Sequence, residues 1–336
     1  MAQEGKAAMQ RDTTEMAKTN QNRPEGFDAF VEQQIQPLFE EFKLAQAVGY
    51  ARLRKFGAIG AIIGAALGGW LYLQQPKIWP VCVILIIAFT VLGMIPGWLK
   101  LVEAKDSFGT EHVGRISKFL GLDHQAAGFE PPLFEQFNQL DLVPVGDRHS
   151  FSDLVCGTHD GTKFTIYAAH VEERRTRTST DSKGNTTTET YWATIFNGQL
   201  LHSPYPRKFA CTTILARDRG WFNTKGRFGK KMKPMGLADP KFEKLFEVYT
   251  TDQVEGRFLV DPTFMTRLLA LEDSHKKRKT MTAFHQQSVL VALQGGTSFF
   301  GKLGKKSSAA GLAADTLHAF QIIFHFLEML KGKKRS

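Results

Sequence analysis

The chain has few of the features by which enzymes and extracellular proteins are usually recognised. Its 336 residues include three cysteines, Cys82, Cys156 and Cys211. They form no C-x-x-C pair, which excludes a disulfide framework and a cysteine-based zinc site and suits a reducing compartment. The G-x-S-x-G and H-E-x-x-H motifs of serine hydrolases and zinc proteases are also absent. The sequence therefore indicates no catalytic residue, no metal ligand and no cofactor.

Acidic residues are outnumbered, with 33 Asp and Glu against 43 Lys and Arg, for a formal net charge of +10. This excess favours anionic lipid as a partner first and nucleic acid second. No aromatic-interleaved strand or helix-turn-helix accompanies the basic clusters, so we expect no nucleic-acid binding. A solvated face near an anionic membrane accounts for the clusters more simply. They are Lys225/Arg227/Lys230/Lys231/Lys233, Lys276/Lys277/Arg278/Lys279 and Lys331/Lys333/Lys334/Arg335.

The last of these clusters is the candidate lipid-contacting group: Lys331, Lys333, Lys334 and Arg335. It follows a predicted amphipathic helix over Leu312–Leu330, and each basic residue near an anionic surface contributes about 1 kcal/mol. In one interpretation the helix lies at the membrane interface with Phe320, Phe324 and Leu327. In the other it packs on the sheet and the basic tail is merely solvated.

Two long uncharged runs, Phe56–Leu73 and Ile78–Leu99, are separated by four residues. About 20 apolar residues span the hydrocarbon of a bilayer, so the pair predicts a transmembrane helical hairpin. A buried hairpin of a soluble protein is the less favoured alternative. Aromatic residues that prefer the membrane interface lie near the ends of the runs: Trp70, Tyr72, Trp79 and Trp98.

The flanking charges predict the orientation of this hairpin. The turn between the runs contains one basic residue, Lys77, whereas five flank the outer ends: Arg52, Arg54, Lys55, Lys100 and Lys105. The positive-inside rule then places both termini in the cytoplasm, as expected for a multi-pass protein of the inner (plasma) membrane. The first run starts too late for a cleaved signal peptide, so we expect it to be retained.

A repeat of small residues, Gly60-x-x-x-Gly64-x-x-x-Gly68, marks one face of the first predicted span. Such a motif lets another helix approach closely. The glycines are therefore candidate helix-packing residues, either against the second span of the same chain or against another copy in a homo-oligomer.

We predict a disordered tail over 1–25, an amphipathic helix over 26–55, a transmembrane hairpin over 56–99 and a cytoplasmic α+β domain over 106–336. The amphipathic helix follows from apolar spacing, and Pro37 is expected to kink it. The domain should combine an antiparallel sheet with flanking helices. Strands are predicted at Phe164–Val171, Tyr191–Phe196 and Phe209–Leu215, with a hairpin of 280–285 and 288–294.

Two helices of this domain are expected to start at Asp239-Pro240 and Asp261-Pro262, where Asp caps the helix and Pro takes its first position. The polar stretch between the first two predicted strands, EERRTRTSTDSKGNTTTET, is expected to be a mobile hairpin loop. Its composition is short of the apolar side chains from which strands are usually predicted.

A segment resembling a P-loop, Gly296 to Lys302, is not expected to bind a nucleotide. Leu303 stands where a working loop needs Ser or Thr for magnesium, and Gly304 follows where a helix should begin. The strand before it belongs to a hairpin rather than to a βαβ unit. A linker with Phe299 and Phe300 in the core is the simpler interpretation.

Other candidate groups have structural explanations. His318 and His325 are seven residues apart on one predicted helix, about 10 Å along its axis, too far for one metal ion. Asp147, His149 and Asp153 are close in sequence but match no catalytic spacing, so a polar turn is preferred. Asp252-x-x-Glu255 fits a catalytic carboxylate pair, although a capping box at a helix start explains it more simply.

The segment Leu237–Asp273, LADPKFEKLFEVYTTDQVEGRFLVDPTFMTRLLALED, resembles the bacterial membrane proteins of domain-of-unknown-function family 3137. Similar runs are D-P-x-F-E, F-x-V-Y-x-x-D-Q-V-E and P-x-F-M-x-R-L, although Gly256 stands where the family usually has alanine. Further similar pieces are Phe151–Gly157, Ile195–Gly198 and Ile35–Leu38, so that the likeness spans roughly residues 27 to 300. The resemblance implies a two-span anchor with a cytoplasmic domain and supplies no activity.

The leading hypothesis is an integral inner-membrane protein with a non-enzymatic binding or regulatory module facing the cytoplasm. Its expected partners are the lipid bilayer, anionic head groups, and a protein partner or second copy through the spans. The alternative is a membrane-bound, hydrolase-like enzyme whose active site is dispersed in the sequence. A cleft of ionisable residues with shifted pKa values would favour the enzyme. An apolar groove or exposed sheet edge would favour binding.

Overall fold

The computed structural model describes residues 23–180, 186–217, 232–237, 239–274, 279–295 and 307–330. The chain forms two compact units: the first comprises Met1–Arg115 with Phe300–Asp315, the second Ile116–Phe299 with Thr316–Ser336. Residues 1–22 of the predicted disordered tail lie outside the described part of the chain.

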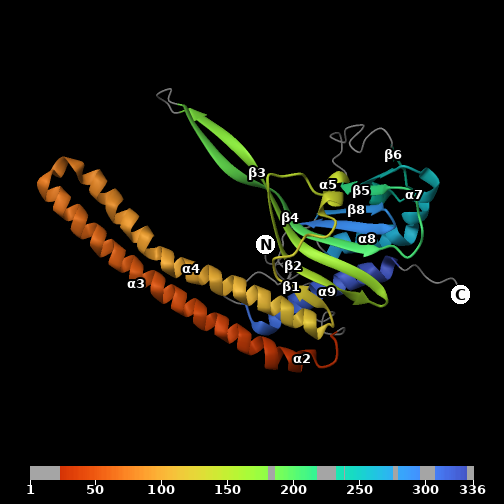
Figure 1. Ribbon diagram of the computed structural model, residues 1–336, viewed down its shortest axis with the longest axis horizontal. Helices are drawn as coiled ribbons and strands as arrows, with labels where there is room; N and C mark the ends of the chain where they lie inside the picture. Colours follow the sequence, from red (N-terminus) through yellow and green to blue (C-terminus); the bar gives the residue numbers. More distant parts are fainter. Residues whose placement is uncertain are drawn as a thin grey trace, which may run out of the picture. The chain divides into compact units, whose positions relative to one another are not determined.

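Long helices dominate the first unit (Figure 1). A short helix α2 (Phe27–Phe30) and a π-turn η1 (Val31–Ile35) precede α3 (Gln36–Gln74), and a 3-10 turn η2 (Pro76–Ile78) leads into α4 (Trp79–Phe119). Pro37 lies in the first turn of α3, directly after the π-turn. Because proline has no N–H, this position interrupts the regular hydrogen-bond ladder and α3 starts anew there. Both long helices are apolar and long enough to cross a membrane.

The glycine face of α3 lies against α4 of the same chain. A Cβ added to Gly60 would overlap the carbonyl of Phe89, and one added to Gly64 would lie 2.7 Å from the Cα of Ile86. A Cβ added to Gly68 would lie 3.1 Å from the carbonyl oxygen of Cys82. The backbones of the two helices are thus too close for any larger side chain at Gly60 or Gly64. Packing of these glycines against another copy stays a prediction.

Beyond the uncharged runs, the two helices are joined by an aromatic cluster. The rings of Phe42 and Phe108 are 4.9 Å apart, and Phe108 also contacts Phe39 on α3. Nearer the end of the unit, Arg115 donates a hydrogen bond to the carbonyl of Gln34 at 2.8 Å. The hairpin is therefore stabilised outside its uncharged part by buried apolar contacts.

Over the described residues, the second unit contains a nine-stranded antiparallel sheet in the order β1-β2-β3-β4-β9-β8-β5-β7-β6, which confirms the α+β class (Figure 1). Its strands are β1 (Asp123–Gln125), β2 (Arg148–His159), β3 (Thr162–Thr180), β4 (Thr186–Pro204), β5 (Thr213–Arg217), β6 (Lys233–Pro234), β7 (Phe246–Thr250), β8 (Lys279–His285) and β9 (Ser288–Gln294). The helices are α5 (Phe134–Gln139), α6 (Pro240–Glu243), α7 (Gln253–Leu259) and α8 (Pro262–Ser274), together with the part of α9 (Ala309–Leu330) from Thr316 onward.

Side chains from both faces of the sheet are buried. On one face, Phe137 of α5 belongs to a cluster with Tyr167, Phe196 and Leu200, and the hydroxyl of Tyr167 donates to the carbonyl of Pro132 at 2.9 Å. Phe164 lies on the opposite face by the alternation of strand residues, and its ring contacts Phe324 of α9 at 6.0 Å. Burial on both faces accounts for the apolar runs in β3, β4, β8 and β9.

The last helix packs within the protein rather than presenting its apolar stripe outward. Phe320 and Leu327 are fully buried, and Phe324 is half-buried against His159, which stacks on its ring at 4.1 Å. The interpretation with these three residues at a membrane interface is therefore wrong. The apolar face of α9 is already occupied.

The stretch predicted to be a mobile loop is mostly strand. β3 continues to Thr180 and β4 begins at Thr186, and their pairing runs without a break from Glu172↔Thr194 to Thr180↔Thr186. The two strands form a ribbon that projects from the sheet in Figure 1. The loop prediction was wrong here because it relied on missing apolar residues, whereas cross-strand pairing forms these strands without burial.

Candidate functional site

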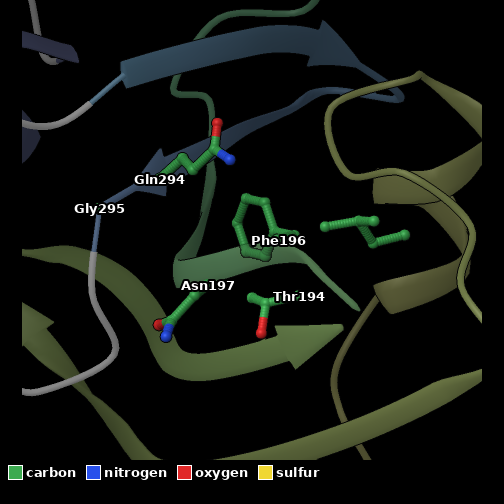
Figure 2. A pocket seen from close by; sticks show the side chains of 6 residues that line it. Thr194, Phe196, Asn197, Gln294 and Gly295 are labelled. Atoms are coloured by element: carbon green, nitrogen blue, oxygen red, sulfur yellow. The ribbon is translucent and has the colours of Figure 1, made fainter. Parts of the chain in front are cut away.

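A shallow pocket lies at the root of the ribbon, where β9 ends beside β4 (Figure 2). The ladder between these strands runs from Pro204↔Ser288 to Gly198↔Gln294, and Gly295 then donates its N–H to the carbonyl of Asn197 at 2.9 Å. The pocket has a volume of about 350 Å³ and is lined by Thr194, Ile195, Phe196, Asn197, Gln294 and Gly295. It therefore opens at the point where β4 passes beyond the end of β9.

The lining of this pocket is neutral. Its polar side chains are the amides of Asn197 and Gln294 and the hydroxyl of Thr194 (Figure 2). The amide oxygen of Asn197 is buried and accepts no hydrogen bond within the described structure. Amides and hydroxyls both donate and accept hydrogen bonds, so the lining suits neutral polar groups such as peptide units better than a charged substrate. The hydroxyl of Thr194 lies 3.0 Å from Nε2 of His170 on the neighbouring strand, an exposed cross-strand contact.

A β-bulge shapes the same region. Val171 of β3 pairs with Phe196, whereas Glu172 pairs with Thr194, so Ile195 is an extra residue in β4. A bulge bends its strand and increases the local twist. The bulge lies at the point where the ribbon leaves the body of the sheet.

The two carboxylates of the D-Q-V-E segment, Asp252 and Glu255, accept hydrogen bonds from backbone N–H groups rather than forming a catalytic pair. Asp252 caps α7 by accepting the N–H groups of Val254 and Glu255 at 2.8 and 2.9 Å. A full capping box also requires the Glu255 carboxylate to accept the N–H of Asp252. It does not do so, and that N–H lies 3.3 Å from the hydroxyl of Thr250 instead. The N-cap interpretation of Asp252 is thus correct, and the reciprocal half of the capping box is wrong.

Glu255 instead reaches a distant segment of the chain. Its carboxylate accepts the N–H of Ala210 at 3.0 Å and that of Cys211 at 2.6 Å. Burial alone would raise the pKa of Glu255, but these backbone donors outweigh it and lower the pKa. A carboxylate stabilised in its charged form in this way is a poor general acid.

The neighbouring thiol is not activated either. Cys211 is buried, and its sulfur lies 3.3 Å from the hydroxyl of Thr213, which in turn lies 2.9 Å from that of Thr250. Burial raises the pKa of the Cys211 thiol, and the nearby Glu255 carboxylate raises it further. The thiol therefore remains protonated at neutral pH, and the cluster links β5 to β7 rather than presenting a nucleophile.

His285 lies next to this network without completing a catalytic arrangement. Its Nδ1 is 2.9 Å from the hydroxyl of Thr212, and burial lowers the pKa of the imidazole. Thr212 also donates its N–H to the hydroxyl of Thr251 at 2.9 Å. These contacts connect the segment before β5 to β7 and β8. The partners, both side-chain and backbone, therefore come from three parts of the sequence.

The three residues grouped as a polar turn lie along or next to β2 and have separate partners. Asp147 accepts the N–H of Arg174 at 2.8 Å, and His149 contacts the ring of Phe134 at 5.1 Å. Asp153, at a left-handed position with φ 53°, lies 3.2 Å from Nε2 of His124. The turn interpretation is wrong because residues 148–159 form a strand with a bulge near Asp153.

Ser152 adds a serine hydroxyl to the His124–Asp153 pair, but in the wrong order for catalysis. Its hydroxyl donates to Asp153 at 3.1 Å, so the carboxylate stands between serine and histidine. In a hydrolytic triad the histidine stands between the other two and takes the serine proton. The cluster fits a structural role at the bulge.

The remaining candidates are placed as follows. His318 and His325 are both exposed on α9. Among the described residues, no group of three or more His, Cys, Asp or Glu side chains is placed to hold a metal ion. The P-loop-like segment, the cluster at 331–335, and most of the other two basic clusters lie outside the described ranges.

Part of the chain is similar to a known family. Residues 194–331 match the family described as "Protein of unknown function (DUF3137)". The crystal structure of the mycobacterial trehalose monomycolate transport factor A, TtfA, is similar with a TM-score of 0.35 and 13% sequence identity, covering 66% of this chain and 94% of that chain. No curated protein matches the sequence. The resemblance to domain-of-unknown-function family 3137 is therefore confirmed over residues 194–331, which contain the Leu237–Asp273 segment.

Proposed function

We propose that this protein is a membrane-anchored, non-enzymatic binding or regulatory module whose α+β domain faces the cytoplasm. The observation that supports the anchor is the outward surface of the helical hairpin. While the glycine face of α3 packs on α4, large apolar side chains such as Ile62, Leu73 and Ile84 point away from the pair and are 69%, 82% and 63% exposed. An apolar surface of this extent fits lipid far better than water.

The spacing of exposed aromatic rings supports the same proposal. Trp79 and Trp98 of α4 are 61% and 58% exposed. They are 19 residues apart, and at about 1.5 Å per residue this is about 28 Å along the helix. The hydrocarbon core of a bilayer is about 30 Å thick. The two rings would therefore lie at the opposite interfaces, where tryptophan is enriched.

The proposed orientation follows from the flanking charges. The outer ends of the spans have Arg52, Arg54, Lys55, Lys100 and Lys105, against Lys77 in the turn. The positive-inside rule places the outer ends, which have more basic residues, in the cytoplasm. We place the anchor in a bacterial inner membrane because the proteins that the sequence resembles are bacterial.

Binding rather than chemistry is supported by what the polar residues do. The carboxylates of Asp252 and Glu255 accept backbone N–H groups, and the Cys211 thiol has a raised pKa. The exposed ribbon of β3 and β4 offers sheet edges instead, and such edges bind extended peptides by adding a strand. The proposed docking element is this ribbon together with the neutral pocket at its root.

Two measurements test the anchor and its orientation. The protein should remain with membranes after a high-salt wash, because apolar insertion does not depend on ionic contacts. Alkaline phosphatase fused after Lys105 should be inactive, and the same enzyme inserted at Lys77 should be active. An active fusion at Lys105, or release by salt, would contradict the proposal.

Crosslinked purification of the native protein from membranes tests the binding role. A matched variant replaces residues 174–192 with a two-residue Asn-Gly turn, which shortens the ribbon and leaves the body of the sheet intact. Partners that crosslink to the native protein and not to the shortened variant support docking at the ribbon. Equal recovery with both proteins would place the binding surface elsewhere.

A further inference from the structure

The distal part of the ribbon lacks support from the rest of the sheet. The pairing of β2 with β3 ends at Arg148↔Glu172, and that of β9 with β4 ends at Gly198↔Gln294. Residues 173–180 and 186–194 pair only with each other in the described structure, and nearly all of them are exposed. A two-stranded hairpin is marginally stable at best in water, and a third strand stabilises it. The ribbon therefore favours the addition of a strand.

The two edges of the ribbon differ in charge. Along β3, residues 173–177 include Glu173, Arg174, Arg175 and Arg177. Charged residues on an edge strand oppose pairing with other strands. Residues 186–196 of β4, TTTETYWATIF, contain a single charge, Glu189, which pairs across the ribbon with Arg177. The β4 edge consists almost entirely of β-branched and aromatic residues, the composition that pairs most readily.

We propose that the β4 edge, residues 186–194, pairs antiparallel with the same edge of a second copy of this chain. The proposal rests on the proposed use of the ribbon as a docking element and names its occupant. A two-fold axis brings identical surfaces together, so the edge must be complementary to itself. In this case the pairing joins two ribbons into a four-stranded sheet.

With the axis placed at the opposed residues Thr190 and Thr176, self-complementarity holds for β4 and fails for β3. An antiparallel pairing centred on Thr190 places Glu189 opposite Tyr191 of the second copy and Thr188 opposite Trp192 of the second copy. No like charges meet, and Tyr191 and Trp192, which are 46% and 45% exposed, gain cross-strand neighbours. A corresponding pairing of two β3 edges centred on Thr176 places Arg175 opposite Arg177 of the second copy. Directly opposed like charges are destabilising, so the β4 edge is the one that fits.

The chain offers a matched pair of positions for the test. Thr190 of β4 and Thr176 of β3 are opposite each other in the ribbon, so their side chains lie on the same face. Thr190→Lys places two ammonium groups beside the two-fold axis, whereas Thr176→Lys adds the same charge one strand away from it. The full chain would be purified in detergent and reconstituted in nanodiscs, and its mass measured by light scattering over a range of concentrations.

We expect the wild type and Thr176→Lys to be dimers and Thr190→Lys to be monomeric at the same concentration. In addition, oxidised Thr190→Cys should form a disulfide-linked dimer, because residues opposite each other at the axis have neighbouring Cβ atoms. Thr176→Cys and the wild type, with Cys82, Cys156 and Cys211, are the controls. A monomeric wild type, or a dimer that Thr190→Lys leaves intact, overturns the proposal. Retention on membranes after a salt wash is measured separately, so failure of the dimer is distinguishable from failure of the anchor.

Discussion

Glu255 and Cys211 are joined by a hydrogen bond of 2.6 Å from the backbone N–H of Cys211 to the carboxylate. The same carboxylate accepts the N–H of Ala210, so the two N–H groups before β5 are satisfied by a side chain from α7. Asp252, at the start of that helix, satisfies two N–H groups of α7 itself. Two carboxylates three residues apart thus have separate structural roles.

Removal of the Glu255 carboxylate should destabilise the domain. Glu255→Ala leaves the N–H of the buried Cys211 without its acceptor, at a cost of about 1–3 kcal/mol, whereas the N–H of the exposed Ala210 can bond water instead. Thermal unfolding of the full chain in detergent should show a lower midpoint than wild type. Glu130→Ala, at an exposed position, is the control and should leave the midpoint unchanged. Equal midpoints for both variants would mean that the hydrogen bonds contribute nothing measurable.

Gly256 allows a close approach that alanine would disturb. A Cβ at this position would lie 2.8 Å from the hydroxyl oxygen of Thr250 and 3.2 Å from the sulfur of Met235. Alanine in a helix is favoured over glycine by about 1 kcal/mol, but overpacking costs about 1–3 kcal/mol. Because hydrogen bonds to Thr213 and Asp252 hold Thr250 in place, we expect Gly256→Ala to lower the unfolding midpoint. A Thr250→Ala/Gly256→Ala double variant should lose less stability than the sum of the two single variants.

Much of the fold is predictable wherever local signals coincide. Asp239 and Asp261 cap their helices as the Asp-Pro pairs predict, accepting the N–H of Phe242 at 3.1 Å and of Phe264 at 2.7 Å. The hairpin of β8 and β9 turns at Gln286 and Gln287, both at positive φ, as its alternating flanks indicate. Cap chemistry and strand alternation act over a few residues, so the sequence reveals both.

The ribbon, β2 and the contacts of Glu255 depend on distant partners instead. The third predicted strand begins at Thr213 rather than Phe209, because the residues before it are held by the Glu255 side chain rather than by a ladder. The bulge near Asp153 breaks the alternation that would reveal β2. Glu255 lies more than 40 residues from its partners, and no local pattern indicates such a contact.

Leu268 of α8 should be among the most sensitive core positions. Its side chain is fully buried in the described structure. Truncation of a buried leucine to alanine costs about 2–5 kcal/mol, because both apolar burial and packing are lost. Leu268→Ala should lower the unfolding midpoint strongly, whereas Thr266→Ala, at an exposed position on the same helix, should have a small effect. An unchanged midpoint for Leu268→Ala would contradict its burial.

His112 should make stability fall in acid. It is buried near Phe108, and burial lowers the pKa of its imidazole to about 4 from 6.5, although a hydrogen bond with the backbone of Leu312 opposes the shift. The unfolded chain takes up the proton below about pH 6.5, whereas the folded chain does so only near pH 4. Stability is therefore complete above pH 6.5 and decreases as the pH falls toward 4, by up to about 3 kcal/mol from this residue.

The pH profile of a His112→Gln variant isolates this contribution. Burial also lowers the pKa values of His202 and His285, so they add pH dependence of the same sign and remain in the variant. The unfolding midpoint of the variant should therefore decrease less than that of wild type between pH 6.5 and pH 4. Parallel profiles would show that the pKa of His112 is the same in the folded and the unfolded chain, which would contradict the shift. Any structural cost of the substitution shifts the whole profile and does not change this comparison.

The close packing of α3 on α4 is testable with two glycines on the same helix. A Cβ on Gly64 would lie 2.7 Å from the Cα of Ile86, whereas one on Gly69 meets nothing within 4 Å. Gly64→Leu must therefore separate the two backbones, because the obstructing atom is main chain and cannot rotate away. Gly69→Leu adds the same side chain on an open face of α3. We expect Gly64→Leu to lower the unfolding midpoint in detergent and Gly69→Leu to leave it nearly unchanged.

The oligomeric state of the same two variants separates contacts within the chain from contacts between copies. If the glycine face packs within each chain, Gly64→Leu loses stability at every protein concentration. If it joined two copies, the loss would appear as dissociation and would diminish as the concentration rises. A concentration-independent decrease for Gly64→Leu, with no change for Gly69→Leu, is the expected result. A loss of stability for Gly64→Leu that diminishes as the protein concentration rises would instead place the second span of another copy against Gly60, Gly64 and Gly68.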